Sequence, residues 1–397
     1  MDITINPRLL RGTVPAIASK SQVHRLLISA AFADAPTKLL CHTTNREIEA
    51  TADCLRALGA EIIRTEDGYQ IQPIRNLPEK ARLECCESGS TLRFLLPVAG
   101  ALGVDAEFHM EGRLPQRPLS PLWEEMERMG CTFSRPAADV LRCQGQLKKG
   151  NYRIDGGVSS QYITGLLFAI ALLGDSSLSI LGKTESKPYI HMTLDTLKQF
   201  GLNIADFQIS GMPRLHSPGT ISMEGDWSNA AFFLAANALG SSISVTGLNP
   251  ESVQGDRAIV STLSDLACGN EIDAADMPDL IPVLAVAAGA GNGGVFHHIS
   301  RLRLKESDRV QSILDLIHSL GGSAEADSDT LTVFGTGFRG GTVSSAGDHR
   351  IAMAAAVAAT VCREPVTILG ADAVRKSYPG FWEDYRSLGG SYEQHLR

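Results

Sequence analysis

The chain repeats one pattern of apolar and polar positions: an amphipathic helix that ends in a bulky residue and a glycine, then a short alternating segment. In the first copy, ADCLRALGAEIIRTEDGYQIQP, Ala52, Leu55 and Leu58 share one helical stripe, and the glycine follows as the residue after the helix. Five more copies follow at intervals of roughly 50 to 70 residues, a spacing typical of repeated units. Their glycines are Gly59, Gly130, Gly201, Gly269, Gly321 and Gly389.

Between these copies lie second helices that open on serine-rich turns, at residues 19–33, 91–102 and 161–173. Six α/β units over 397 residues predict two similar domains of three units each. The midpoint falls where a strand from Thr220 runs into an apolar helix from Ser228; the fourth copy is degenerate. A ligand between two such domains is expected where helix N-termini converge.

Composition narrows the functional class. A formal charge of -8 argues against a general nucleic-acid or anionic-membrane surface, although a local cleft can still be basic. No apolar run reaches the roughly 20 residues that span a bilayer, and the start MDITINPRLLRG has no signal-peptide pattern. The eight cysteines form no CxxC pair, which predicts reduced, mostly buried thiols. We expect a cytoplasmic protein.

The segment 19–25 opens a helix whose apolar stripe lies at residues 26, 27, 30 and 31. Ser21 and Arg25 are four residues apart and share the face away from that stripe, with Lys20 beside them. A hydroxyl and a guanidinium at a helix N-terminus suit a bound anion. The alternative is a serine cap with a solvated basic face.

Three more segments open helices with small residues: ESGSTLR around Gly89, GGVSSQ ending at Gln161, and SKPY from Ser186 to Tyr189. Free backbone amides and hydroxyls at such turns bind a carboxylate or phosphate. Ordinary helix capping explains each segment equally well, and for Ser186, two residues before Pro188, it is the stronger explanation.

The segment RLRLKESDR places Lys305 and Arg309 four residues apart, where like charges repel on a helix. A bound anion would turn that repulsion into a clamp, and Asp308 is the competing local partner. Glu306, beside two cations, is expected to stay ionised unless it is desolvated or engaged.

Asp279 stands alone in the apolar run MPDLIPVLAV, either as a helix-dipole partner or as a general base in a dry site. Arg350 in GDHR and Lys376 in KSYPGF are further candidate cations. His297-His298 has no partners at metal spacing, and neither a GxxxxGK[ST] nor a strand-linked GxGxxG sequence is present. The residues alone therefore predict a two-domain α/β protein with an anion-binding cleft and no metal.

These segments, in this order from residue 19 to residue 381, resemble the 5-enolpyruvylshikimate-3-phosphate synthase family of enolpyruvyl transferases. The ordered set is specific, although each segment alone is weak. The resemblance implies an inside-out α/β barrel in each of two similar domains, built from three βαβαββ repeats. The N-terminal domain would span residues 13–221, and the C-terminal domain residues 1–12 plus 222–397.

The resemblance also implies the reaction. The enolpyruvyl group of phosphoenolpyruvate would pass to the 5-hydroxyl of shikimate-3-phosphate by addition and elimination, releasing phosphate, in the shikimate pathway that leads to chorismate and the aromatic amino acids. Only these two small molecules would be partners, without nucleic acid or membrane. No cofactor and no metal are expected, and the chain would be a monomer.

Carried over residue by residue, the resemblance assigns three sets of side chains. The predicted shikimate-3-phosphate contacts are Lys20, Ser21, Arg25, Ser159, Ser160, Gln161, Ser186, Tyr189, Asp279 and Lys305. The predicted phosphoenolpyruvate contacts are Lys20, Gly89, Arg117, Gln161, Arg309, Arg350 and Lys376. For catalysis, Asp279 would engage the hydroxyl, Glu306 would exchange the proton at C3, and Lys20 would assist.

Two rival functions would share this fold. The sister enzyme that acts on UDP-N-acetylglucosamine uses a loop cysteine, and the corresponding loop here, residues 112–120, has none. A non-catalytic anion-binding relative would have lost Lys20, Asp279 or Glu306, and all three are present. The sequence also departs from the commoner family pattern at Ile17-Ala18, Glu87, Ser90 and Arg301.

Overall fold

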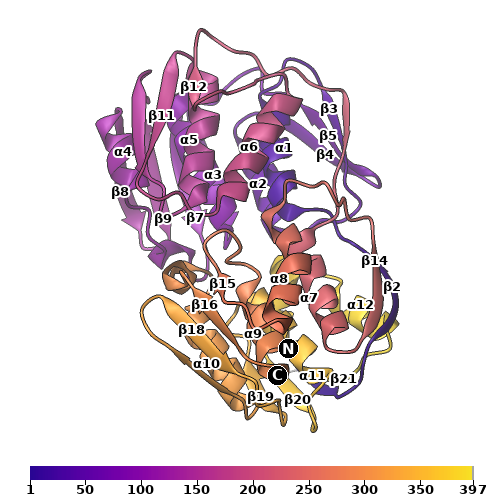
Figure 1. Ribbon diagram of the computed structural model, residues 1–397. Helices are drawn as coiled ribbons and strands as arrows, with labels where there is room; N and C mark the ends of the chain where they lie inside the picture. Colours follow the sequence, from indigo (N-terminus) through magenta and orange to yellow (C-terminus); the bar gives the residue numbers. More distant parts are fainter. Residues whose placement is uncertain (396–397) are drawn as a thin grey trace. The chain divides into compact units, whose positions relative to one another are not determined.

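The computed structural model describes residues 1–395, and its chain contacts divide into two compact units (Figure 1). Ala18–Met223 forms the N-terminal unit, and Met1–Ile17 with Glu224–Arg397 forms the C-terminal unit. The boundaries predicted after residues 12 and 221 fall inside strands β2 (Arg11–Pro15) and β13 (Thr220–Ser222). The domain division at those positions stays a prediction.

The N-terminal unit has three open sheets, with strand orders β13-β3-β5-β4, β6-β7-β9-β8 and β10-β11-β12. Its strands are β3 (Thr37–Leu40), β4 (Glu61–Thr65), β5 (Gly68–Gln72), β6 (Lys80–Cys86), β7 (Asp105–Met110), β8 (Cys131–Ala137), β9 (Val140–Gly145), β10 (Asn151–Asp155), β11 (Ser176–Leu181), β12 (Gln208–Ile209) and β13. Its helices are α1 (Lys20–Ala31), α2 (Arg46–Ala57), α3 (Gly89–Leu102), η1 (Leu114–Gln116), α4 (Leu122–Arg128), α5 (Ser160–Leu173) and α6 (Lys187–Gln199).

The C-terminal unit also has three open sheets, β19-β20-β1-β21, β14-β2 and β15-β16-β18-β17. Its strands are β1 (Asp2–Asn6), β2, β14 (Ser242–Thr246), β15 (Ile272–Asp273), β16 (Gly294–His297), β17 (Ser323–Ala326), β18 (Thr330–Phe334), β19 (Gly341–Ser344), β20 (Val366–Leu369) and β21 (Ser391–His395). Its helices are α7 (Trp227–Ala238), η2 (Gly255–Ala258), α8 (Ile259–Ala267), α9 (Ile281–Ala290), η3 (Ser300–Leu304), α10 (Arg309–Ser319), α11 (His349–Ala359), η4 (Ala371–Lys376) and α12 (Phe381–Ser387).

The sheets repeat one topology. In four of them a parallel pair is followed by two antiparallel pairings, as in β6-β7-β9-β8 and β15-β16-β18-β17. Strand β1 fills the third place in the sheet β19-β20-β1-β21, and β2 pairs with β14. These pairings explain why the first residues belong to the C-terminal unit. The predicted mixed α/β class with repeated units is therefore confirmed.

The six predicted repeat glycines all have positive φ, between 79° and 118°. Each follows a helix, and four lie one or two residues before the start of an edge strand, as Gly59 does between α2 and β4. At Gly59 an ideal Cβ would lie 2.5 Å from the carbonyl oxygen of Asn76, so a side chain is excluded by both space and φ. The degenerate fourth copy covers α8 and the two-residue strand β15, which belongs to the sheet β15-β16-β18-β17.

Each unit has its own apolar core. In the N-terminal unit α1, α3 and α5 are buried over most of their length, as the predicted helices at 19–33, 91–102 and 161–173 required. Gly165 on α5 lies against the backbone of Arg93 on α3, so these two helices approach closely. In the C-terminal unit the alanine-rich helices α9 and α11 take the same central place.

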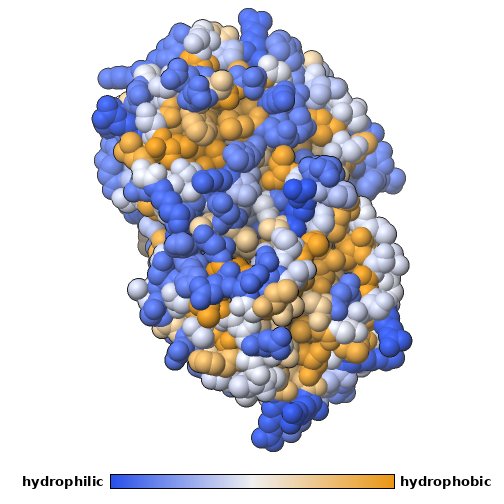
Figure 2. All heavy atoms as spheres, viewed as in Figure 1, coloured by the Kyte–Doolittle hydropathy of each residue, from blue (hydrophilic) through white to orange (hydrophobic). Residues whose placement is uncertain are grey.

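The described residues contain no helix long and apolar enough to cross a membrane. All eight cysteines are free thiols; six are buried, Cys86 is partly buried and Cys268 is exposed. The prediction that most of the thiols are buried is confirmed; that they are reduced in the cell stays a prediction. Figure 2 shows hydrophilic and apolar side chains interspersed on one face of the molecule.

Candidate active site

Arg25 on α1 is held inside the N-terminal unit and is only 2% exposed. Its Nε donates to Thr193 Oγ1 (2.8 Å) and its Nη1 to the carbonyl oxygen of Ser21 (2.6 Å). Its Nη2 donates to Thr164 Oγ1 (3.3 Å) and to the carbonyl oxygen of Tyr189 (3.0 Å). The alternative of a solvated basic face is wrong, because α1 is buried from Gln22 onward.

The guanidinium of Arg25 is hydrogen-bonded by neutral oxygens only, so its positive charge is not neutralised. Burial lowers the pKa of this guanidinium to about 9, and the guanidinium carbon lies 4.9 Å from the centre of the Phe94 ring. A guanidinium has five N–H donors, and four are used by protein oxygens. Among residues 1–395 one N–H donor of Nη1 therefore has no protein acceptor, and the guanidinium keeps a net positive charge.

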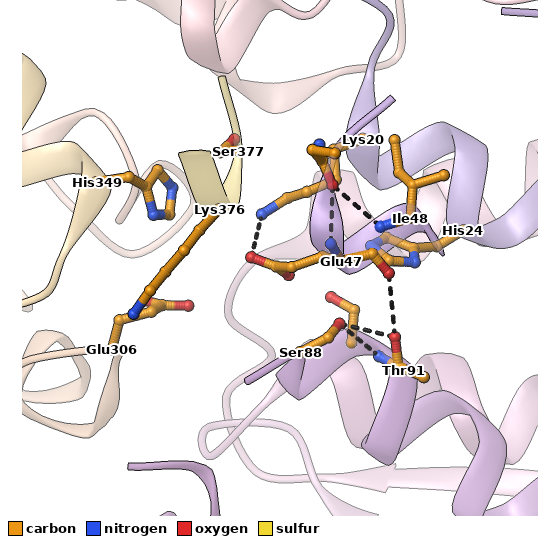
Figure 3. Close-up of polar contacts among 12 residues, drawn as sticks. Lys20, His24, Glu47, Ile48, Ser88, Thr91, Glu306, His349, Lys376 and Ser377 are labelled. Atoms are coloured by element: carbon orange, nitrogen blue, oxygen red, sulfur yellow. Dashed lines mark hydrogen bonds and ion pairs between the residues drawn. The ribbon is translucent and has the colours of Figure 1, made fainter. Parts of the chain in front are cut away.

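Lys20, at the first turn of α1, has a carboxylate partner. Its Nζ lies 3.0 Å from Glu47 Oε1, and the two side chains are 13% and 11% exposed (Figure 3). Glu47 lies in the first turn of α2, whose N-cap Asn45 accepts hydrogen bonds from the amides of Glu47 and Ile48. The predicted assisting cation is thus fixed between two helix starts.

Gly89 begins α3, directly after the N-cap Ser88, whose hydroxyl accepts from the amide of Thr91 (3.1 Å). The guanidinium of Arg117, just after η1, lies against Gly89. An ideal Cβ at Gly89 would lie 2.7 Å from Arg117 Nη1, so glycine leaves the space that Arg117 occupies. The structure brings these two predicted phosphoenolpyruvate contacts together.

Gln161, in the first turn of α5, is held by three partners. Its amide donates to the N-cap Ser159 Oγ (3.3 Å), and its Oε1 accepts from Arg93 Nη1 (2.7 Å). Its Nε2 donates to Ser90 Oγ (3.0 Å), so α3 orients this α5 side chain. Ser160, also predicted, is buried beside it as the first residue of α5.

Ser186 stands at the N-cap position of α6 in a left-handed conformation, with φ 54° and ψ 39°. Its side chain makes no capping hydrogen bond, so the prediction that it caps the helix is wrong in that respect. It is 1% exposed. A buried non-glycine residue in this region stores backbone strain, which is typical of functional sites.

The C-terminal unit gathers a second group around Arg309, which is 1% exposed. Its Nη1 lies 2.6 Å from Asp279 Oδ1, its Nη2 2.7 Å from Glu306 Oε2, and its Nε 2.8 Å from Asp348 Oδ2. Asp308 pairs with Arg303 instead (3.3 Å). The proposed local partner of Lys305 therefore serves another cation.

Asp279 lies just before α9 and is contacted by three cations. Its Oδ2 accepts from Arg350 Nη2 (2.9 Å), and Lys305 Nζ lies 3.9 Å from its Oδ1. Burial alone would raise the pKa of Asp279, but Arg350, Lys305 and Arg309 together hold that pKa well below its usual value. Burial lowers the pKa of Lys305 to about 8, against the attraction of Asp279.

Asp348 is a fully buried residue with two tasks. As N-cap of α11 it accepts from the amide of Arg350 (2.9 Å), and it also accepts from Arg309 Nε and from Ser307 Oγ (3.2 Å). Although burial alone would raise the pKa of Asp348, Arg309 holds it below its usual value. One carboxylate thus fixes two predicted phosphoenolpyruvate-binding arginines.

Lys376 ends η4 and donates to the carbonyl oxygen of Gly347 (2.8 Å). In Figure 3 its side chain points toward Glu306 of the same unit. The predicted site residues therefore form two groups, one in each unit. The N-terminal group is Lys20, Ser21, Arg25, Gly89, Arg117, Ser159, Ser160, Gln161, Ser186 and Tyr189; the C-terminal group is Asp279, Lys305, Glu306, Arg309, Arg350 and Lys376.

Sequence reasoning gave no role to three residues that the structure joins to these groups. Glu47 holds Lys20, Arg93 holds Gln161, and Asp348 holds Arg309. Asp348 and Arg93 lie inside segments that the motifs marked, but Glu47 carries no local signal. The N-terminal group offers helix N-termini and hydroxyls suited to anions, and the C-terminal group pairs cations with carboxylates suited to proton transfer.

Solved structures of enolpyruvyl transferases share this fold. The chain is similar to the EPSP synthase from Acinetobacter baumannii (TM-score 0.79, 22% identity, 99% of this chain and 100% of that one). It is also similar to the enolpyruvyl transferase NikO from Streptomyces tendae (TM-score 0.76, 17% identity, 100% and 99% covered). At these identities the likeness shows the fold: that of an enolpyruvyl transferase.

Comparison with related sequences shows which family of enolpyruvyl transferases the chain belongs to. The sequence model for EPSP synthase (3-phosphoshikimate 1-carboxyvinyltransferase) matches residues 5–385. The 3-phosphoshikimate 1-carboxyvinyltransferase of Clostridium kluyveri is 39% identical over 99% of this chain and 98% of its own length. That of Clostridium perfringens is 37% identical over 98% of each. The chain belongs to the EPSP synthase family, and the resemblance predicted from its motifs is confirmed.

Proposed function

We propose that this chain transfers the enolpyruvyl group of phosphoenolpyruvate to the 5-hydroxyl of shikimate-3-phosphate and releases phosphate. The carrying observation is the family match over residues 5–385, which spans both groups of site residues. The reaction is a step of the shikimate pathway toward chorismate. The relatives with the same full-length match bear the name of this transferase, which disfavours the sugar-nucleotide alternative.

Shikimate-3-phosphate binding is assigned mainly to the N-terminal group. Ser159, Ser160 and Ser186 would hold the 3-phosphate at the starts of α5 and α6, where amides and hydroxyls favour an anion. The other proposed contacts are Lys20, Ser21, Arg25, Gln161, Tyr189, Asp279 and Lys305. The strained, buried Ser186 supports this assignment because its conformation gives no capping benefit.

Phosphoenolpyruvate carries a carboxylate and a phosphate, and guanidinium groups pair with both in bidentate geometry. We assign it to Lys20, Gly89, Arg117, Gln161, Arg309, Arg350 and Lys376. The space at Gly89 filled by Arg117 supports the first part of this subsite. Arg309 and Arg350 would exchange part of their carboxylate contacts for the substrate's anionic oxygens.

This exchange of partners by Arg309 and Arg350 would change the pKa of Asp279, the proposed base. The 5-hydroxyl oxygen bonds to C2 of phosphoenolpyruvate while C3 takes a proton; C3 then loses a proton as phosphate leaves. With its pKa held low, Asp279 is a weak base toward the hydroxyl. When substrate anions take N–H donors from Arg309 and Arg350, the pKa of Asp279 rises toward a useful value. Glu306 would exchange the C3 proton, with Lys20 assisting.

We further propose that the chain works as a monomer in the cytoplasm. Six buried free thiols fit a reducing compartment. The exposed large apolar side chains, such as Ile63, Leu181 and Val260, come from separate elements. Size-exclusion chromatography with light scattering would test the first point, and cell fractionation the second.

The test of the function is phosphate release from phosphoenolpyruvate by the purified chain. Release with shikimate-3-phosphate and none with UDP-N-acetylglucosamine is expected. Release only with the sugar nucleotide would transfer the same fold to the sister reaction. Silence with both acceptors would contradict the proposal and support a non-catalytic anion-binding protein.

A further inference from the structure

Helices α1 and α2 are joined by two polar contacts with the same spacing on each helix. Lys20 Nζ meets Glu47 Oε1 at 3.0 Å (Figure 3). One helical turn further, His24 Nδ1 meets Thr51 Oγ1 at 2.7 Å. Residues four apart share a helix face, so Glu47 and Thr51 present one edge of α2 to one edge of α1.

The same edge of α2 also holds the start of α3. Thr51 Oγ1 lies 2.7 Å from Thr91 Oγ1, and Thr91 donates to Ser88 Oγ (2.7 Å). Ser88 caps α3 directly before Gly89. A continuous hydrogen-bond chain therefore runs from His24 on α1 through Thr51 on α2 to Thr91 and Ser88 at the start of α3, and all four side chains are buried.

The hydrogen-bond directions in this chain are consistent with one arrangement. Because Thr91 donates to Ser88, Thr51 donates to Thr91 and His24 donates from Nδ1 to Thr51. His24 Nε2 then carries no proton and finds no hydrogen-bond partner among residues 1–395. Burial, with Lys20 and Arg25 nearby, keeps the His24 pKa well below its usual value, which agrees with a neutral ring. This hydrogen-bond chain fixes α1 and α2 relative to each other one turn away from the Lys20–Glu47 ion pair.

We propose that Glu47 is a positioning residue that aims the ammonium group of Lys20 during enolpyruvyl transfer. A lysine side chain carries its ammonium group on a flexible four-carbon stem, so the position of that group depends on its hydrogen-bond partners. Glu47 supplies a partner that is itself fixed, by the N-terminal turn of α2 and by the Thr51 contact one turn away. This inference rests on the role proposed above for Lys20.

The test compares Glu47→Gln, Glu47→Asp and a matched control, Asp53→Asn. Asp53 is a carboxylate on the same helix, 60% exposed and paired with Arg56. We expect Glu47→Gln to lower kcat by about tenfold to a hundredfold, the effect of misplacing a reacting group by about 1 Å. The KM for shikimate-3-phosphate should change by less than about threefold, since the other contacts of that substrate stay in place. Asp53→Asn should match the wild type.

Glu47→Asp keeps the charge and withdraws it by one methylene, so part of the lost kcat should return. This variant also guards against a Glu47→Gln chain that does not fold, which urea unfolding of both would reveal. A Glu47→Gln enzyme that is folded and turns over at the wild-type rate would overturn the inference. So would equal losses in kcat and in the affinity for both substrates, because that pattern indicates general damage.

Lys20→Ala separates the two proposals. Near wild-type turnover in Lys20→Ala would remove the proposed role of Lys20 and the inference built on it. Loss of turnover in Lys20→Ala, with Glu47→Gln unaffected, would leave the role of Lys20 standing and overturn only the inference. Loss in both variants, with partial recovery in Glu47→Asp, is the expected result.

Discussion

The two groups of site residues each contain a buried arginine, but the hydrogen-bond partners of these arginines differ in charge. In the N-terminal unit all four hydrogen bonds of Arg25 go to neutral oxygens. In the C-terminal unit Arg309 contacts three carboxylates, those of Asp279, Glu306 and Asp348. The first arrangement keeps a net positive charge inside the protein, and the second neutralises it.

This difference indicates different ways of receiving an anion. Near Arg25 a phosphate or carboxylate would add a missing negative charge, and little existing pairing would be broken. Around Arg309 an anion must replace or share carboxylate partners, and removing one partner from a buried ion pair is costly. We infer that the N-terminal group is preorganised for shikimate-3-phosphate, while the C-terminal group rearranges its pairing as phosphoenolpyruvate binds.

The largest effect should come from the carboxylate at the centre of the C-terminal group. Asp279→Asn removes the proposed base and should lower kcat by about 10²- to 10⁴-fold, with near-normal affinity for shikimate-3-phosphate. Steady-state kinetics and calorimetry measure the two quantities. Asp308→Asn, at a half-exposed helix cap outside the cluster, is the control. An Asp279→Asn enzyme with nearly full turnover would sink the assignment.

Replacing Arg309 should lower the free energy of unfolding more than replacing Arg25. Arg309→Leu leaves three carboxylates without their shared cation and should lower the free energy of unfolding by about 3–5 kcal/mol. Arg25→Leu leaves only neutral acceptors unpaired and should cost about 1–3 kcal/mol. Urea unfolding of both variants measures the difference. Equal losses would mean that the contrast between charged and neutral partners does not matter.

The Gly89 position tests the proposed phosphoenolpyruvate subsite. A methyl group there would lie 2.7 Å from Arg117 Nη1, so the guanidinium must move by several tenths of an ångström. We expect Gly89→Ala to raise the KM for phosphoenolpyruvate by about tenfold, with a smaller change for shikimate-3-phosphate. Gly380→Ala, at a glycine with open space and negative φ, is the matched control. An unchanged KM would remove Arg117 from the subsite.

The smallest effect should be a pH dependence from Lys305. Because burial brings its pKa to about 8, Lys305 loses its charge as pH rises above 8, and shikimate-3-phosphate affinity should fall a few-fold up to pH 9. For stability the sign is opposite. Between pH 8 and the ordinary pKa of 10.5 the unfolded chain holds the proton that the folded chain has lost. The free energy of unfolding therefore rises with pH in this range, because the cost of burying the charged Lys305 disappears.

Lys305→Arg stays charged throughout this range and supplies the comparison. Binding by this variant should lose the decline above pH 8. Calorimetric titrations of both proteins with shikimate-3-phosphate, from pH 7 to pH 9, would check it. The same decline in both proteins would assign the pH dependence to another group.

The sequence predicted the features that depend on local patterns. The glycine after each helix, the apolar stripes and the serine-opened turns all lie within a few residues of one another, so periodicity reveals them. The six glycines of positive φ and the helices α1, α3 and α5 follow directly. The ordered motifs identified the family, which is a property of the whole set.

What local patterns could not predict was the set of partners. Three of the four oxygens around Arg25 come from α5 and α6, far along the chain, so its burial was not visible in segment 19–25. Asp348 holds Arg309 across 39 residues, and Glu47 holds Lys20 across 27. These contacts depend on how sheets and helices pack, and a single sequence carries no local signal for them.

We propose that residues of both groups serve one enolpyruvyl transfer. NMR of a reaction with shikimate-3-phosphate and phosphoenolpyruvate labelled with ¹³C at C2 would follow that transfer. We expect a labelled enol ether on the 5-oxygen, formed in equal amount with phosphate, and its loss in Asp279→Asn. Labelled pyruvate with phosphate, and no enol ether, would show hydrolysis in place of transfer and would contradict the proposal.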